Sequence, residues 1–230
     1  TLGLTGDGAK FKINLENIDG VNGKLASVSY LAPIGSELVM TIDLDDFSTL
    51  DASNTTDLKS TLLHEMVHAV MANQMNLAAT PTWFAEGTAE AVRGADNRVA
   101  ADVAGLGVAA IKGQLNTIFI NNSAPTGTAL EVAGVYSGGY IAMRFLEDQI
   151  GGAGIQSLMG ALAGGASFDA ALNTASAGTI PDNTTFQANL MAGTVFEDFI
   201  TGSINTGNLD NGAFGGFDAS GGVSKEDTIT

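Results

Sequence analysis

Both histidines of this 230-residue chain lie in one pentapeptide, His64-Glu65-Met66-Val67-His68, and their spacing constrains the backbone around them. Residues four apart lie one turn apart on the same face of an α-helix, so two imidazoles at this spacing can reach one metal ion if the segment is helical. Apolar residues recur at helical spacing from Thr55 to about Met75, and no Gly or Pro interrupts them. The sequence therefore predicts a helix over residues 55–76 that carries both histidines.

The pentapeptide has the form H-E-x-x-H, which is typical of zinc sites built on one helix. His64 and His68 are the predicted zinc ligands, and Glu65 is placed to act as general base on a metal-bound water. The alternative is that both are ordinary, partly buried helix histidines. Because the chain uses histidine nowhere else, the sequence favours the metal site.

A catalytic zinc ion needs a third protein ligand and a position left for water. Glu86 follows His68 by 18 residues, which leaves room for a turn and a second helix over residues 81–93 that opens at Pro81. Glu90 lies on the same helical face as Glu86 and is predicted to hydrogen-bond the outer nitrogen of a ligand histidine. The alternative for both glutamates is a solvated helix face. The sequence predicts Glu86 as the third ligand, supported by Glu90.

The motif followed by Trp-Phe-Ala-Glu-Gly-Thr-Ala-Glu at residues 83–90 resembles the gluzincin metallopeptidases, whose zinc ligands are two histidines and a downstream glutamate. The resemblance covers residues 58–92. It implies a zincin-like α+β fold, in which a small N-terminal mixed sheet precedes a mainly helical lobe and the active-site cleft lies between them. In this family an edge strand just before the motif helix binds the extended substrate. Residues 37–44 alternate in strand fashion and are expected to form that edge strand.

Gluzincins also place a donor, often a tyrosine or a histidine, near the oxyanion of the tetrahedral intermediate. This chain has no third histidine, so a tyrosine, an arginine or a backbone amide is expected in that role. Residues 135–146 resemble the downstream helix of collagenase-like gluzincins, which implies Tyr136 as the first candidate and Tyr140 as the second. The alternative for both tyrosines is a packing role. For Arg144 the two possibilities are a contact with a substrate carbonyl and a surface salt bridge with Asp148.

The remaining pattern divides the chain into a sheet, a helical region and a tail. Strand-like alternation between turn signals predicts the sheet over residues 10–46, and helical signals continue to about residue 200. A metallopeptidase domain is expected over residues 1–205, with a Gly/Asn/Asp-rich tail over 206–230 that has room for a short strand. Beyond the two helices already predicted, the expected helices span residues 98–115, 134–150, 153–164, 167–176 and 185–200.

The charge balance limits the partners of the chain. It carries 25 acidic and 9 basic residues, a net charge of −16, which argues against nucleic acid and anionic membranes as partners. No cysteine is present to form a disulfide or to supply a thiolate. The sequence does not open with a basic segment followed by an apolar run. We therefore expect secretion either by a signal peptide that was removed or by another route.

Two groups of acidic residues are candidates for a calcium site. Their simpler alternative role is to keep the chain soluble through their charge. Calcium prefers six to eight oxygen ligands, often from clustered aspartates and carbonyls. The first group does not follow the spacing of an EF-hand loop. The groups are Asp43, Asp45, Asp46, Asp51 and Asp57, and Asp210, Asp218, Glu226 and Asp227.

The acidic, Ala/Gly/Thr/Asn-rich composition is similar to the variable middle region of bacterial flagellins, into which the gluzincins called flagellinolysins are inserted. This resemblance implies an extracellular domain on a flagellar filament. We therefore expect a secreted zinc metalloendopeptidase that cuts extended protein or peptide substrates. Two alternatives stay open: a non-catalytic structural or adhesive filament domain that keeps the fold, and an aminopeptidase. The aminopeptidase is disfavoured because no Gly-x-Met-Glu-Asn-type motif precedes the histidines.

Overall fold

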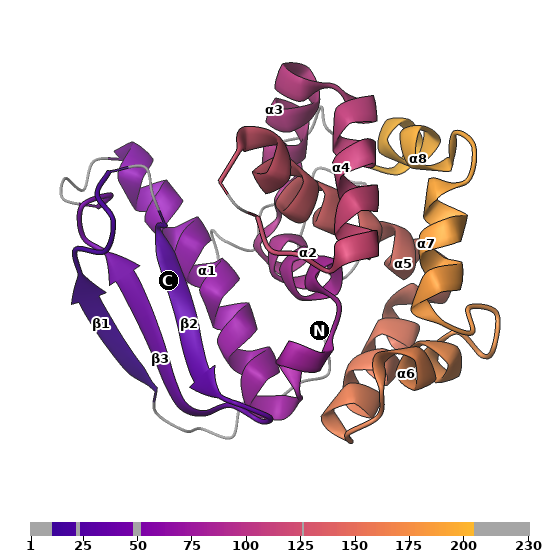
Figure 1. The fold of residues 1–230 in the computed structure, drawn as a ribbon, viewed down its shortest axis with the longest axis horizontal. Coiled ribbons are helices and arrows are strands. Elements are labelled where there is room, and N and C mark those ends of the chain that lie inside the picture. The colour runs from indigo at the N-terminus through magenta and orange to yellow at the C-terminus, as the bar shows by residue number, and fades with distance from the viewer. Residues whose placement is uncertain (1–10, 22–23, 48–51, 126, 205–230) are drawn as a thin grey trace. The chain divides into compact units, whose positions relative to one another are not determined.

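The computed structural model describes residues 11–21, 24–47, 52–125 and 127–204, and the side chains of residues 52–57 are not included. The chain divides between Ala78 and Ala79 into two compact units, which are described separately. The described part is α+β and mostly helical, with a small mixed sheet near the N-terminus, as the sequence predicts (Figure 1).

In its described residues, the N-terminal unit is a three-stranded sheet followed by one long helix. Its elements are β1 (Lys12–Glu16), β2 (Ala26–Leu31), β3 (Ser36–Asp43) and α1 (Ala52–Gln74). The strand order is β1-β3-β2, with β3 parallel to β1 and antiparallel to β2. Helix α1 packs against β2 and β3. The observed α1 overlaps almost all of the helix predicted over residues 55–76.

The prediction that residues 37–44 form an edge strand is wrong. They make up most of β3, which is the central strand and pairs on both sides, whereas β1 and β2 are the edges among the described strands. Alternation shows which side chains share a face of a sheet, but it does not show how many neighbours a strand has. The parallel pairing of β3 with β1 joins segments far apart in sequence, and no local pattern indicates it.

The face of the sheet toward α1 forms a small apolar core. Ala26, Met40, Ile42 and Phe47 are buried there. Leu58 and Leu62, one helical turn apart on α1, pack against this cluster. The apolar stripe that predicts the helix is therefore the stripe that attaches α1 to the sheet, and it fixes the orientation of the two histidines on the same helix.

Asp43 is a buried carboxylate that ties together the segments following two strands. Its Oδ2 accepts hydrogen bonds from the amides of Ile18 and Asp19, each at 3.2 Å, and its Oδ1 accepts one from Asp45 at 2.9 Å. The bond from Asp45, with those from Asp19 and Ile18, holds the pKa of the Asp43 carboxyl below its usual value. Both oxygens thus have a structural use, which weakens the calcium alternative for the first acidic group. Asp51, the side chain of Asp57 and the second acidic group lie outside the described residues.

We expect Asp43 to make the stability of this unit pH-dependent. Because its pKa is lower in the folded state, its contribution is complete above the unfolded value of about 4 and is lost as the pH falls through the folded-state pKa. Asp43→Asn should be less stable at pH 7 and should lose this part of the acid sensitivity. Urea unfolding at pH 7 and pH 3 measures both effects. The same pH dependence of the unfolding free energy in wild type and Asp43→Asn would contradict the assignment.

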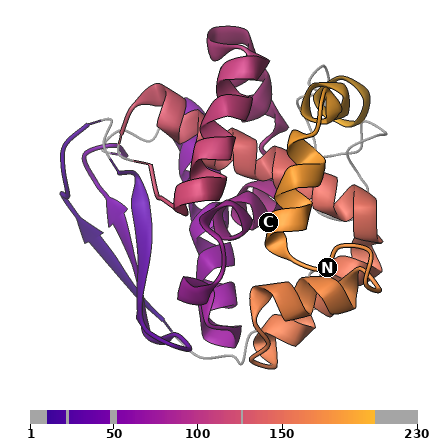
Figure 2. The same cartoon turned by 45° about the vertical axis from the view of Figure 1, so that its right-hand side comes forward.

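The second unit is helical and is organised around its longest helix. In the views of Figures 1 and 2, α5 lies in the middle of this unit, and it contacts α2, α3, α4, α6 and α7. Its helices are α2 (Thr82–Arg93), α3 (Asp96–Leu106), α4 (Val108–Asn121), α5 (Ala129–Ala163), α6 (Phe168–Ala175), α7 (Asn183–Met191) and α8 (Val195–Ser203). A short 3-10 turn, η1 (Leu77–Ala79), precedes α2.

Glycines explain where the observed helices depart from the predicted ones. The single helix predicted over residues 98–115 is two helices, α3 and α4, because Gly107 adopts a φ of +84° between them. The helix predicted over 185–200 likewise divides into α7 and α8, with Gly193 at a φ of +50° in the gap. Gly151 interrupts α5 at the break predicted between residues 150 and 153. The apolar pattern does not indicate such breaks, because it continues across a glycine whether or not that glycine adopts a positive φ.

Among the described residues, no single helix has the length and apolar character needed to cross a membrane. The bent pair of α3 and α4 reaches that length and composition only when the two are taken together, and they turn by 111°.

Two glycines allow α2 to approach α5 closely. A Cβ added at Gly87 would lie 2.2 Å from the carbonyl oxygen of Gly139, and one at Gly139 would lie 3.1 Å from the Gly87 nitrogen. The two backbones therefore touch where the helices cross. This contact fixes the position of α2 along α5, and therefore the position of the glutamates on either side of Gly87.

Gly87→Ala is expected to destabilise the helical unit by about 1–3 kcal/mol or more, because a methyl group here must push two helices apart. Thermal and urea unfolding measure the loss. Gly113→Ala on α4 is the matched control, since no atom lies within 4 Å of the added Cβ. That variant should be neutral or slightly more stable, because alanine favours a helix over glycine by roughly 1 kcal/mol. Equal stability of Gly87→Ala and wild type would contradict the close crossing.

Candidate metal centre

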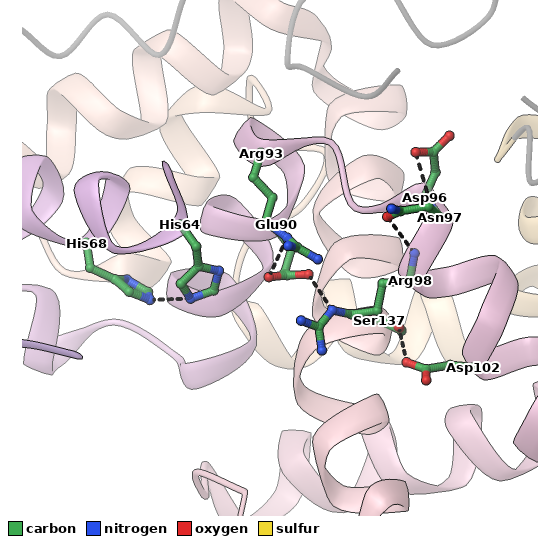
Figure 3. Close-up of polar contacts among 9 residues, drawn as sticks. All are labelled: His64, His68, Glu90, Arg93, Asp96, Asn97, Arg98, Asp102 and Ser137. Carbon is green, nitrogen blue, oxygen red and sulfur yellow. Dashed lines mark hydrogen bonds and ion pairs between the residues drawn. The ribbon is translucent and has the colours of Figure 1, made fainter. Parts of the chain in front are cut away.

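Helix α1 brings His64 and His68 together. Their Nε2 atoms lie 3.0 Å apart, and the rings meet edge to face with centroids 4.7 Å apart (Figure 3). Two nitrogens bound to one tetrahedral zinc ion at about 2.0–2.1 Å would be roughly 3.4 Å apart. The spacing predicted from the sequence is therefore confirmed, and the two imidazoles are close to a chelating arrangement without a change of rotamer.

Glu65 lies beside the first histidine in a protected environment. It is 9% exposed and His64 is 8% exposed, whereas Met66 is on the accessible side of α1. Glutamate is rarely buried in proteins unless it has a partner or a chemical role. The burial of Glu65 next to two converging imidazoles fits the general base predicted from the sequence.

Helix α2 carries both predicted glutamates and is anchored by the aromatic residues of the same motif. Trp83 and Phe84 are buried, and Trp83 stacks on Phe186 with ring centroids 4.7 Å apart. This packing leaves Glu86 half-buried on α2, while Glu90, one turn later, is fully enclosed. The helix predicted over residues 81–93 is observed as Thr82–Arg93, with Pro81 at its N-cap.

Glu90 is bound by two arginines. Its side chain is 1% exposed, its Oε1 lies 3.0 Å from Nε of Arg93, and its Oε2 lies 3.1 Å from Nε of Arg98 (Figure 3). A buried carboxylate requires such compensation, because an unpaired charge in the interior is strongly destabilising. The hydrogen bond predicted from a ligand histidine to Glu90 stays a prediction. Sequence reasoning missed both arginines: Arg93 was visible as an i+3 neighbour, but Arg98 comes from the next helix.

The two candidate tyrosines on α5 have different environments. Tyr140 is fully buried, and its hydroxyl accepts a hydrogen bond from Nη1 of Arg144 at 3.1 Å. Arg144 also pairs with Glu147 at 3.3 Å, so it is held within α5. Tyr136 is half-buried, and the guanidinium carbon of Arg98 lies 5.1 Å from its ring centroid. Tyr136 is therefore the more accessible of the two tyrosines, and Tyr140 lies in the core of the helical unit.

We compared the chain with protein-family models, with curated proteins and with solved structures, and found no match in any of the three.

Proposed function

We propose that this chain is a zinc-dependent endopeptidase of the gluzincin type with a zincin-like fold. The observation that carries the proposal is the pair of Nε2 atoms 3.0 Å apart on α1, with Glu65 adjacent to the first histidine. Two imidazoles and a carboxylate at this spacing are what metal-assisted hydrolysis requires. The proposal includes the active-site cleft that the resemblance to gluzincins implies.

We propose that His64, His68 and Glu86 each give one ligand atom to the metal ion. The two histidines are supported by their converging Nε2 atoms on α1, and Glu86 is supported by its place in the gluzincin-like segment that follows the motif. Two imidazole nitrogens and one carboxylate oxygen suit zinc, and three protein ligands leave a position open for water, as in catalytic zinc sites. With no cysteine in the chain, a structural zinc site built on thiolates is excluded.

The other residues then have separate roles in hydrolysis. Bound zinc would supply Lewis acidity, which brings the pKa of a water toward 7. Glu65 takes the proton from the attacking water and delivers it to the leaving amine. The hydroxyl of Tyr136 donates a hydrogen bond to the oxyanion of the tetrahedral intermediate. Glu90, held by its two arginines, orients a ligand histidine from behind.

We further propose an extracellular setting on a bacterial flagellar filament, supported by the resemblance to flagellinolysins and by the acidic, cysteine-free composition. Its substrates would be extended proteins or peptides. Sequencing the gene on both sides of this segment tests the placement. Flanking helices of the flagellin coiled-coil type are expected, and flanks of an unrelated kind would contradict it.

The function is tested by incubating the zinc-loaded chain with a mixed peptide library and identifying the products by mass spectrometry. Internal peptide bonds should be cut, a zinc chelator should stop cleavage, and added zinc should restore it. Bound zinc without any cleavage would support the structural or adhesive alternative instead. Removal of N-terminal residues alone would point to an aminopeptidase, and cleavage that resists the chelator would contradict the zinc mechanism.

A further inference from the structure

Four side chains from three helices meet in the helical unit: Glu90 and Arg93 from α2, Arg98 from α3 and Tyr136 from α5. Figure 3 shows the first three of them, with both arginines directed at the carboxylate of Glu90. Arg98 of α3 links α2 to α5, because it pairs with Glu90 and lies over the ring of Tyr136. The cluster therefore couples a residue on the glutamate helix to the candidate oxyanion donor.

Each oxygen of the Glu90 carboxylate has an arginine beside it. Arg93, three residues away on the same helix, lies 3.0 Å from Oε1. Arg98 adds a second positive charge at 3.1 Å. Its side chain is 32% exposed, so the guanidinium lies at the boundary between Glu90 and solvent, over an aromatic face. A cation over a tyrosine ring is attracted by about 0.5–1 kcal/mol or more.

We infer that Arg98 is a positioning residue for Tyr136, an inference that rests on the proposed peptidase function. A tyrosine hydroxyl moves through a wide arc when the side chain turns about its Cα–Cβ bond, and a misplacement of about 1 Å in an active site can lower the rate roughly a hundredfold. The guanidinium pairs with a buried carboxylate through Nε, and its central carbon lies over the Tyr136 ring, 5.1 Å from the centroid. It holds the ring, and so the hydroxyl, in one orientation relative to α2.

A second contact between α3 and α5 provides a control. Oγ of Ser137 donates a hydrogen bond to Oδ2 of Asp102 at 2.5 Å, one turn along α3 from Arg98. Losing this contact loosens the attachment of α3 to α5 without touching Arg98 or the tyrosine ring. Asp102→Ala therefore shows what a purely structural disturbance of α3 does to the rate.

The experiment is a double-mutant cycle in the zinc-loaded chain, with kcat and KM measured for one peptide substrate. Arg98→Ala should lower kcat by about ten- to a hundredfold with little change in KM. In a Tyr136→Phe background the same substitution should change kcat by less than about twofold, because the hydroxyl that Arg98 positions is gone. Asp102→Ala should leave kcat within about twofold of wild type, and Arg98→Lys, which keeps the charge but loses the planar face, should be intermediate.

Equal losses from Arg98→Ala in both backgrounds would overturn the inference, and so would an equal loss in Asp102→Ala or a Tyr136→Phe variant with wild-type activity. Each of these results leaves the proposed peptidase intact, because the wild type still cuts. A zinc-loaded wild type that cuts nothing overturns the proposed function, and the inference falls with it.

Discussion

Glu65→Gln is expected to abolish peptide cleavage while the zinc content stays at the wild-type level. Glutamine has nearly the same shape as glutamate, but it cannot accept the proton of the attacking water. Loss of a general base lowers the rate by about 10²- to 10⁴-fold. The metal should remain, because Glu65 is not among the three proposed ligands. Parallel measurement of turnover and of zinc by atomic spectroscopy separates the two effects.

Glu16→Gln is the matched control for this variant, because it makes the same substitution at an exposed residue of the same unit. It should retain both zinc and activity. Full activity in Glu65→Gln would remove Glu65 from the mechanism. Loss of zinc in that variant would instead assign Glu65 to the ligands.

Glu86→Ala is expected to lose zinc binding and cleavage together. Losing a partner behind a ligand already weakens metal affinity by about 10- to 100-fold, so loss of a ligand should exceed that range. Competition for zinc with a chromophoric chelator measures the affinity directly, without relying on activity. The two histidines should still bind zinc weakly, because their Nε2 atoms are already 3.0 Å apart on α1.

Asp148→Asn is the control for charge, since Asp148 is an exposed acidic residue of α5 in the same unit as Glu86. Its zinc affinity should match that of wild type. An unchanged affinity in Glu86→Ala would show that another group supplies the third ligand, and the two-histidine, one-glutamate site would then be wrong.

The parts of the site that depend on local geometry could be predicted from the sequence. The i, i+4 spacing of His64 and His68 determines their proximity once α1 forms, and the apolar stripe with Leu58 and Leu62 ensures that it does. The start of α2 is equally local, because Pro81 suits a helix N-terminus.

Features that depend on distant segments were missed. The central place of β3 arises from parallel pairing with β1, which no hairpin or alternation signals. Arg98 reaches Glu90 because the chain turns at Gly94, which has a φ of +79°, and restarts a helix at Asp96. Local spacing cannot give the angle of such a turn. The motif residues were therefore predictable, and the partners that hold them were not.

The most direct test of the proposed site is anomalous diffraction at the zinc edge from crystals of the zinc-loaded chain. We predict one strong zinc peak bound by the Nε2 atoms of His64 and His68 and by a carboxylate oxygen of Glu86, with the fourth position facing Glu65. A zinc peak held by other residues, or no peak at these two histidines, would contradict the site and the hydrolytic function proposed from it.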